Sequence, residues 1–292
     1  MVRSSADVKR VLVTGATGTV GRLVVSELRR AGRVVRILAR KPPPGGVPEG
    51  VELLVGDLAA PESYAAGLAG VDAVFLMWPL FTPGAAPAVL EGVARHARRI
   101  VYLSAASVAG DHATPPVLFH TAIERAIERT RLAWTFLRPT GFATNTLMWA
   151  AQIRDRGIVR WPYGSAARSL IHERDIAAIA ARALVEDGHV GASYVLTGPE
   201  ALTQIDQVRI IGDAIGRPLR YEELPPEVAR AELIAAWGNA GFVDAALAGW
   251  AKLVAAPEGV TRTVLEVTGA PARTFRQWAQ DHAGEFGGAV AA

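Results

Sequence analysis

Three glycines at positions 15, 18 and 21 carry the most specific chemical signal in the chain. They lie in Thr14-Gly-Ala-Thr-Gly-Thr-Val-Gly21, directly after the apolar run Arg10-Val-Leu-Val-Thr14. At this spacing the first glycine permits a tight strand-to-helix turn, the second lets a pyrophosphate approach the backbone, and the third lets the helix pack closely on the strand. The free N–H groups at the start of that helix then face the phosphates. We expect dinucleotide contacts from Gly15, Ala16, Thr17, Gly18, Thr19 and Val20.

The end of the second apolar run discriminates between two dinucleotides. Enzymes of this architecture that use NAD place Asp or Glu about twenty residues beyond the glycines, where the carboxylate bonds the ribose 2′-hydroxyl. Here the run ends Leu38-Ala39-Arg40-Lys41, with two cations and no carboxylate. A guanidinium bonds a phosphate in a fork and stacks on adenine. Arg40 and Lys41 therefore predict NADP(H) in preference to NAD(H), the alternative being a solvated pair at a strand end.

Gly56-Asp57-Leu58 follows the third apolar run, where a side chain of this fold usually meets the adenine amino group. We expect Asp57 and Leu58 to contact the cofactor there. Asp57 has a second interpretation, as the cap of a helix that begins near Pro61. The sequence leaves both roles open.

The glycine turn and the two strand ends come together if the apolar runs before them form neighbouring strands of a parallel sheet. Short β-branched runs alternate with helical periodicity through the first half of the chain. The expected strands are 10–14, 34–39, 51–55, 72–77, 99–104 and 134–138, with helices from about 19 and over about 118–131. Right-handed crossovers between them give an α/β fold with a Rossmann-type doubly wound parallel sheet.

The regular alternation of predicted strands and helices ends after Thr140, which indicates a second domain. We expect an NADP-binding domain over 1–140, with 171–187 returning to it. A smaller, mainly helical substrate-side domain is expected over 141–170 and 188–292. Its helices include one at about 203–215 and a long one over 227–253.

Composition excludes several classes of function. The 292 residues contain no cysteine, and the histidine spacing fits no familiar metal site, so we expect no metal. The net charge is +3 and the basic residues are spread along the chain, which predicts no nucleic-acid partner. The longest apolar stretch is too short to span a bilayer, and the first ten residues lack the apolar centre of a signal peptide. We therefore expect no membrane association, a cytoplasmic location and a small-molecule substrate.

The ordered set of motifs resembles the NmrA-like group of atypical short-chain dehydrogenases/reductases. The similarity covers roughly residues 10–225. It rests on the segments 13–21, 39–40, 56–58, 101–104, 137–142 and 171–177. The resemblance implies either a reductase or an NADP-sensing protein, with substrate held between the nicotinamide and a small C-terminal domain.

One departure from ordinary short-chain dehydrogenases concerns the proton donor. The Tyr-x-x-x-Lys pair is absent, Tyr102 lies on a strand, and no lysine occurs between Lys41 and Lys252. Reductases of this group that use a lysine place it four residues before a helical glutamate. Glu124 marks that register, so the resemblance puts His120 in the lysine's position.

His120 is accordingly expected to donate a proton or to bond the nicotinamide ribose, the alternative being a surface histidine without a role. Ser104, past the fifth strand, is the second candidate catalytic residue, because this fold places catalytic hydroxyls there; the alternative is an ordinary small polar residue at a strand end. Both His120 and Ser104 are also expected to contact the cofactor. The remaining expected cofactor contacts, on the nicotinamide side, are Met77, Trp78, Pro139 and Phe142.

Aromatic residues predict a flat or aromatic substrate. The expected substrate contacts are Trp78, Phe81, Ser107, Phe142, Asn145, Trp149, Trp161 and Tyr163. Core packing is the alternative for Trp78, Phe81 and Trp149.

The sequence as a whole predicts an enzyme, an NADPH-dependent reductase that delivers hydride to an activated acceptor. Candidate acceptors are a quinone, an imine or iminium, an enone and a ketone. An acceptor that is already activated does not require the missing Tyr/Lys pair. Two alternatives stay open: a catalytically silent NADP(H)-sensing regulatory protein, and an enzyme that uses the nucleotide for redox-neutral chemistry.

Overall fold

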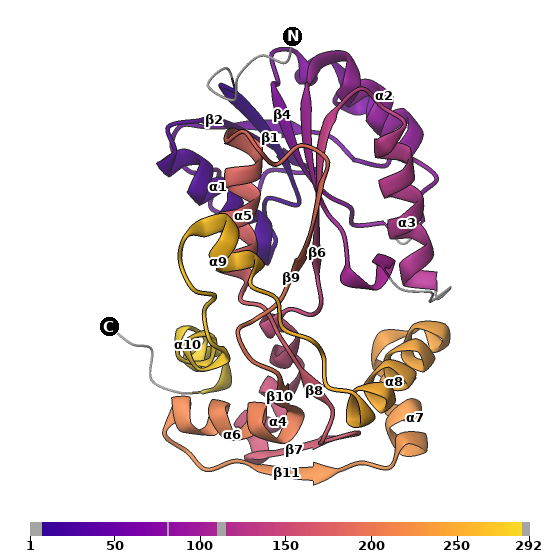
Figure 1. Cartoon of the computed structure of the whole chain (residues 1–292), viewed down its shortest axis with the longest axis vertical. Helices are drawn as coiled ribbons and strands as arrows, with labels where there is room; N and C mark the ends of the chain where they lie inside the picture. Colours follow the sequence, from indigo (N-terminus) through magenta and orange to yellow (C-terminus); the bar gives the residue numbers. More distant parts are fainter. Residues whose placement is uncertain (1–7, 81, 110–114, 288–292) are drawn as a thin grey trace. The chain divides into compact units, whose positions relative to one another are not determined.

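The computed structural model describes residues 8–80, 82–109 and 115–287. These residues form two compact units (Figure 1). Unit 1 comprises the chain up to Pro139 together with Glu173–Leu196, and unit 2 comprises Thr140–His172 together with the chain from Thr197 onward. Each unit is therefore built from two separate stretches of sequence.

A seven-stranded parallel sheet forms the centre of unit 1, in the order β3-β2-β1-β4-β5-β6-β9. The order reverses between β1 and β4, and the carboxyl ends of strands at such a point form the ligand crevice of doubly wound folds. This arrangement confirms the predicted Rossmann-type fold. The strands are β1 (Arg10–Thr14), β2 (Val34–Ala39), β3 (Val51–Val55), β4 (Ala73–Met77), β5 (Arg99–Leu103), β6 (Ala133–Pro139) and β9 (Ala192–Leu196).

Helices cover both faces of this sheet (Figure 1). On one face α1 (Thr19–Arg30) packs against α5 (Glu173–Val185), and α1 turns Val20, Val24 and Leu28 inward as its apolar spacing predicts. On the other face lie α2 (Ala86–His96) and α3 (Pro115–Glu128). The short helices η2 (Pro61–Ser63), η3 (Ala65–Leu68) and η4 (Ala106–Ala109) lie in the connections.

The last strand differs from the expected division of the chain. The stretch expected to return to the first domain ended at residue 187, whereas β9 also belongs to unit 1. The reason is its parallel pairing with β6, in which Leu137 lies opposite Tyr194. The strand completes the edge of the sheet.

Unit 2 is mainly helical and has two small sheets. Parallel β7 (Ile158–Trp161) and β11 (Arg220–Glu223) form one, and antiparallel β8 (Ala167–Arg168) and β10 (Leu202–Thr203) form the other. Both pairings join the two stretches of sequence that make up the unit. The helices are η5 (Ala143–Trp149), α4 (Ala150–Arg156), α6 (Gln204–Ile215), α7 (Pro226–Trp237), α8 (Ala240–Ala255), α9 (Thr263–Thr268), α10 (Phe275–Asp281) and η6 (Ala283–Phe286).

The expected long helix over 227–253 is wrong, because the chain breaks between α7 and α8. Gly238 adopts φ +69°, a left-handed conformation that ends α7. Asn239 then caps α8, its side-chain oxygen accepting a hydrogen bond from the Phe242 N–H at 3.0 Å. A Gly-Asn pair thus ends one helix and begins the next.

Candidate cofactor and active site

The turn between β1 and α1 leaves the start of the helix open to an anion. Gly15 has φ +63°, and the Gly18 N–H donates to its carbonyl oxygen at 3.0 Å. Gly18 is the N-cap residue, no described side chain caps the helix, and the first turn holds no acidic residue. The first N–H groups of α1 and the positive end of its dipole are therefore available to a negatively charged ligand.

Gly21 brings α1 against the turn at a distance that no other residue permits. A Cβ atom on Gly21 would lie 2.6 Å from the Gly15 carbonyl carbon and 2.9 Å from Ala16 Cα, and nearer still to the Gly15 oxygen. All three atoms belong to the backbone, so none can rotate away. The shape of the phosphate-binding turn depends on this absent side chain.

Thr14 joins the turn to the neighbouring strand β4. Its hydroxyl oxygen accepts a hydrogen bond from the Met77 N–H at 2.7 Å and lies 2.9 Å from the Met77 carbonyl oxygen, to which it donates. Met77 in turn lies against Gly15, where a Cβ would overlap its side chain. Sequence reasoning missed Thr14, although a hydroxyl residue between a buried strand and the first glycine was the available signal.

A cavity of about 770 Å³ lies beside the turn, entirely within unit 1. Its wall consists of the turn, the end of β2 with the loop after it, the segment after β3, and the end of β4. Of the predicted cofactor residues the wall includes Gly15, Thr17, Arg40, Lys41, Asp57, Leu58 and Met77. The other predicted cofactor residues, which do not line it, are Ala16, Gly18, Thr19, Val20, Trp78, Ser104, His120, Pro139 and Phe142.

Arg40 and Lys41 are both exposed on this wall. Neither forms an ion pair with a carboxylate among the residues that the structure describes. Their charges are thus free to meet a phosphate on a ligand.

Asp57 closes a turn and does not cap a helix. One carboxylate oxygen accepts from the Ala59 N–H at 2.9 Å, and the Asp57 N–H donates to the Ser63 hydroxyl oxygen at 3.0 Å. The helix η2 that follows has no side-chain cap. The helix-cap alternative is therefore wrong, and the adenine contact stays a prediction.

A second polar group lies between β5 and α3. Tyr102 on β5 is fully buried, and its hydroxyl oxygen lies 2.6 Å from Nδ1 of His120 on α3. Ser104 lies two residues after Tyr102, just past the end of β5, and is only 4% exposed. Its hydroxyl has no hydrogen-bond partner among the described residues. Sequence reasoning set Tyr102 aside, because its place on a strand conceals that it reaches the helix.

Burial keeps both members of this pair uncharged. It lowers the pKa of His120 to about 4, although the charge of Glu124 acts in the opposite direction. Burial also raises the pKa of Tyr102 far above its ordinary value, and Glu124 adds to that effect. At neutral pH the pair consists of a neutral imidazole and a neutral phenol.

An ion pair attaches α3 to the sheet beside His120. Arg138 on β6 donates two hydrogen bonds to the two carboxylate oxygens of Glu124, at 3.0 and 2.6 Å. The Glu124 side chain is 5% exposed and that of Arg138 is 19% exposed. Glu124 lies one helical turn after His120, so the ion pair fixes the face of α3 that carries the histidine.

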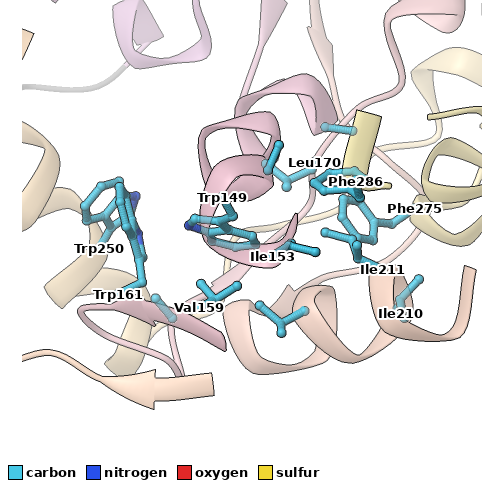
Figure 2. Packing of buried hydrophobic residues seen from close by; sticks show 14 of the residues in the cluster. Trp149, Ile153, Val159, Trp161, Leu170, Ile210, Ile211, Trp250, Phe275 and Phe286 are labelled. Atoms are coloured by element: carbon cyan, nitrogen blue, oxygen red, sulfur yellow. The ribbon is translucent and has the colours of Figure 1, made fainter. Parts of the chain in front are cut away.

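The predicted substrate residues have varied surroundings. Trp149 and Trp161 are 2% and 7% exposed and pack with Trp250 in the core of unit 2 (Figure 2). Trp78 is buried in unit 1, and its indole N–H donates to the Thr82 carbonyl oxygen at 3.0 Å. These placements agree with core packing for the three tryptophans.

The other predicted substrate residues are more accessible. Asn145 and Ser107 are exposed, while Phe142 and Tyr163 are half-buried. Phe81 lies outside the described residues. Substrate contact by this set stays a prediction.

Residues 15–187 match the model of a family described as NAD(P)H-binding. The chain belongs to this family. The match spans the glycine turn, the cavity wall and the Tyr102–His120 pair, and it agrees with the NmrA-like resemblance drawn from the motifs. Among the described helices, none has the length and apolar character needed to cross a membrane.

Two curated relatives match over nearly their full length. The (4-alkanoyl-5-oxo-2,5-dihydrofuran-3-yl)methyl phosphate reductase of Streptomyces griseus subsp. griseus is 40% identical, with 94% of this chain and 99% of the relative covered. The NAD(P)H azoreductase of Xenophilus azovorans is 33% identical, with 96% and 100% covered. Together with the family match, they identify this protein as an NAD(P)H-dependent oxidoreductase.

Solved structures share the fold at lower identity. The triphenylmethane reductase of Citrobacter sp., complexed with NADP(H), superposes with a TM-score of 0.79 at 21% identity and covers 94% of this chain and 99% of its own. The NADPH-dependent quinone oxidoreductase of Escherichia coli, complexed with NADPH, has a TM-score of 0.79 at 20% identity, with 92% and 98% covered. Both confirm the Rossmann-type architecture.

Proposed function

We propose that this protein is an NADPH-dependent reductase that delivers hydride to an activated acceptor without a Tyr-x-x-x-Lys pair. The observation that carries the proposal is the glycine turn, uncapped by any described side chain, beside a cavity on whose wall Arg40 and Lys41 have no carboxylate partner within the described part of the chain. When bound, NADPH supplies the hydride, and the protein sets distance, face and electrostatics.

The preference for NADPH over NADH is assigned to the end of β2. The two exposed cations follow Ala39, where an enzyme that uses NAD would place a carboxylate. A 2′-phosphate at this position meets two positive charges, whereas a 2′-hydroxyl gains little from them. Asp57, with one carboxylate oxygen outside its turn hydrogen bond, is proposed to accept from the adenine amino group.

The acceptor is proposed to be an electron-poor conjugated carbon, such as that of an enone or a quinone, with an imine or ketone as further candidates. The substrate named for the relative of 40% identity contains a ring carbon–carbon double bond conjugated to carbonyl groups. Hydride addition to such a carbon places negative charge on a carbonyl oxygen. One hydrogen-bond donor stabilises that charge without a strong acid.

Ser104 and His120 are proposed as the donors on this side of the cofactor. The buried Ser104 hydroxyl has an unused proton among the described residues. Ser104 follows Tyr102 at the two-residue period of a strand, which places both on the face that α3 covers. The expected product of the reaction is the saturated or reduced acceptor together with NADP⁺.

The cofactor assignment is tested by calorimetry with NADPH and NADH on the wild type, Arg40→Ala and Lys41→Ala. Since charged hydrogen bonds contribute about 1.5–3 kcal/mol, each variant should weaken NADPH binding about 10- to 100-fold and change NADH binding far less. Arg29→Ala, which removes an exposed cation from the far end of α1, is the matched control. Equal affinity for both nucleotides in every variant refutes the NADPH assignment.

The reaction is tested by NADPH oxidation with a panel of enones, quinones, imines and ketones. Turnover of at least one class, reduced about 10-fold or more in Ser104→Ala at saturating NADPH, supports the proposal. Tight NADPH binding without turnover of any acceptor contradicts it.

A further inference from the structure

We infer that Tyr102 is a positioning residue that fixes the tautomer of His120, so that Nε2 carries the ring proton and His120 serves as a neutral hydrogen-bond donor. The placement of His120 at the reaction centre rests on the proposed function. The tautomer itself does not, because it follows from the geometry of the Tyr102–His120 contact.

The argument begins with the hydroxyl proton of Tyr102. The side chain is fully buried, and among the described residues its hydroxyl has one partner, His120 Nδ1 at 2.6 Å. A buried O–H that donates to nothing carries a desolvation cost, whereas a phenol oxygen with an unused lone pair carries much less. The phenol therefore donates and Nδ1 accepts. A neutral imidazole that accepts at Nδ1 holds its proton on Nε2.

The surroundings of His120 favour the neutral ring. Among the described residues, Tyr102 on β5 is its hydrogen-bond partner, and Glu124 on its own helix is the charged group that acts on it. Glu124 would favour an imidazolium, but both of its oxygens accept hydrogen bonds from Arg138. Phe119 lies against the ring, with centroids 4.1 Å apart, and adds apolar surface. The pKa of His120, lowered to about 4 by burial, agrees with this picture.

This assignment changes what His120 contributes to the reaction. A lysine in the same position would bring a positive charge and three donors at neutral pH. The neutral histidine brings one directional N–H, suited to a carbonyl oxygen or a hydroxyl oxygen of a bound ligand. The proton that completes the reduction then comes from water. We therefore expect the rate to show no ionisation of His120 between about pH 5.5 and 8.5.

Nitrogen NMR of the full-length protein tests the tautomer without any substrate. Long-range ¹H–¹⁵N correlations distinguish the two neutral tautomers and the cation, and His120→Gln assigns the signals. The expected result is the Nε2–H form, unchanged down to about pH 5.5. Detection of the Nδ1–H form, or of an imidazolium near neutral pH, overturns the inference.

Tyr102→Phe removes the hydroxyl and keeps the ring that packs edge-on against Phe136. The His120 signals should shift to a mixture of tautomers. The chain also provides a matched control, because the Tyr194 hydroxyl lies 2.8 Å from Nδ1 of another histidine, His189. Tyr194→Phe should alter the signals of His189 and leave those of His120 unchanged. An unchanged tautomer ratio at His120 in Tyr102→Phe overturns the positioning role.

The kinetic counterpart uses the same variants with an acceptor that the wild type reduces. Loss of one neutral hydrogen bond that orients His120 should lower kcat about 3- to 10-fold in Tyr102→Phe, with little change in KM. His120→Gln keeps a neutral donor and should retain more activity than His120→Leu; equal loss in both refutes the donor role. Failure of all variants and of the wild type to turn over would instead refute the proposed function, with the NMR result standing on its own.

Discussion

Gly21→Ala tests whether the close approach of α1 to the glycine turn shapes the cofactor site. The added Cβ would lie 2.6 Å from the Gly15 carbonyl carbon, whereas carbon atoms in contact prefer about 3.5–4.0 Å. The start of α1 must therefore retreat by about 1 Å from the turn. Because Gly15 and Ala16 present only backbone atoms there, no side-chain rotation relieves the overlap.

The magnitude follows from two opposing effects. Overpacking of a close contact costs about 1–3 kcal/mol, and we expect the upper end because the overlap is with backbone. Alanine gains about 1 kcal/mol over glycine within a helix. The net loss in the free energy of unfolding is therefore about 2 kcal/mol. NADPH affinity should fall as well, because the displaced N–H groups are those proposed to meet the pyrophosphate.

Gly92→Ala is the matched control for this substitution. Gly92 lies within α2 of the same unit, and a Cβ there would lie 3.5 Å from its nearest neighbour, Leu68 Cδ1, an ordinary contact. This variant should be more stable by about 0.5–1 kcal/mol and should bind NADPH normally. Urea denaturation and NADPH calorimetry on both variants measure the difference. If Gly21→Ala matches Gly92→Ala in stability and affinity, the reasoning is refuted.

Three further predictions concern stability, each measured by chemical denaturation. Glu124→Gln and Arg138→Met should each lower the free energy of unfolding by about 2–4 kcal/mol. This is somewhat less than the loss for a fully buried ion pair, because the arginine side chain keeps some exposure. A double-mutant cycle that finds no coupling energy between the two residues would contradict this. Thr203→Ala removes the cap of α6 and should cost about 1 kcal/mol, whereas Thr203→Ser should not. Burial alone would raise the pKa of Glu52, but hydrogen bonds from two arginines lower it below its ordinary 4.5. The ionised Glu52 therefore stabilises the folded state above pH 4.5, and this stabilisation is lost as the pH falls through the lower pKa of the folded protein. Glu52→Gln should make the free energy of unfolding depend less steeply on pH in this acidic range. The same pH dependence in variant and wild type would contradict this.

The parts of the fold that sequence predicts well are those specified by local spacing. The glycines at 15, 18 and 21 act on their immediate neighbours, and the apolar period of α1 depends only on residues within the helix. The strand ends that carry Arg40 and Asp57 follow from the same short-range patterns. A parallel sheet then brings these ends to one edge, which is why the cavity wall could be anticipated.

The parts that sequence missed depend on side chains meeting across elements. Nothing in the local pattern shows that Tyr102 on a strand reaches His120 on a helix, since the meeting depends on how α3 is rotated over β5. The Glu124–Arg138 pair that sets this rotation also joins separate elements. Trp149 and Trp161 likewise lie in an irregular, aromatic-rich stretch, and their burial requires α8, which is far along the chain.

The division of each unit into two stretches has a consequence for the order in which the chain is made. The ribosome completes Thr140–His172 before it supplies α5 and β9, so unit 1 cannot close its sheet until about two thirds of the protein has been synthesised. During that time β7 and β8 have emerged without β11 and β10, their partners in unit 2. The nascent protein therefore carries unpaired strands while residues 161–223 are made, about a fifth of its synthesis, and aggregation during translation is the hazard that this topology creates.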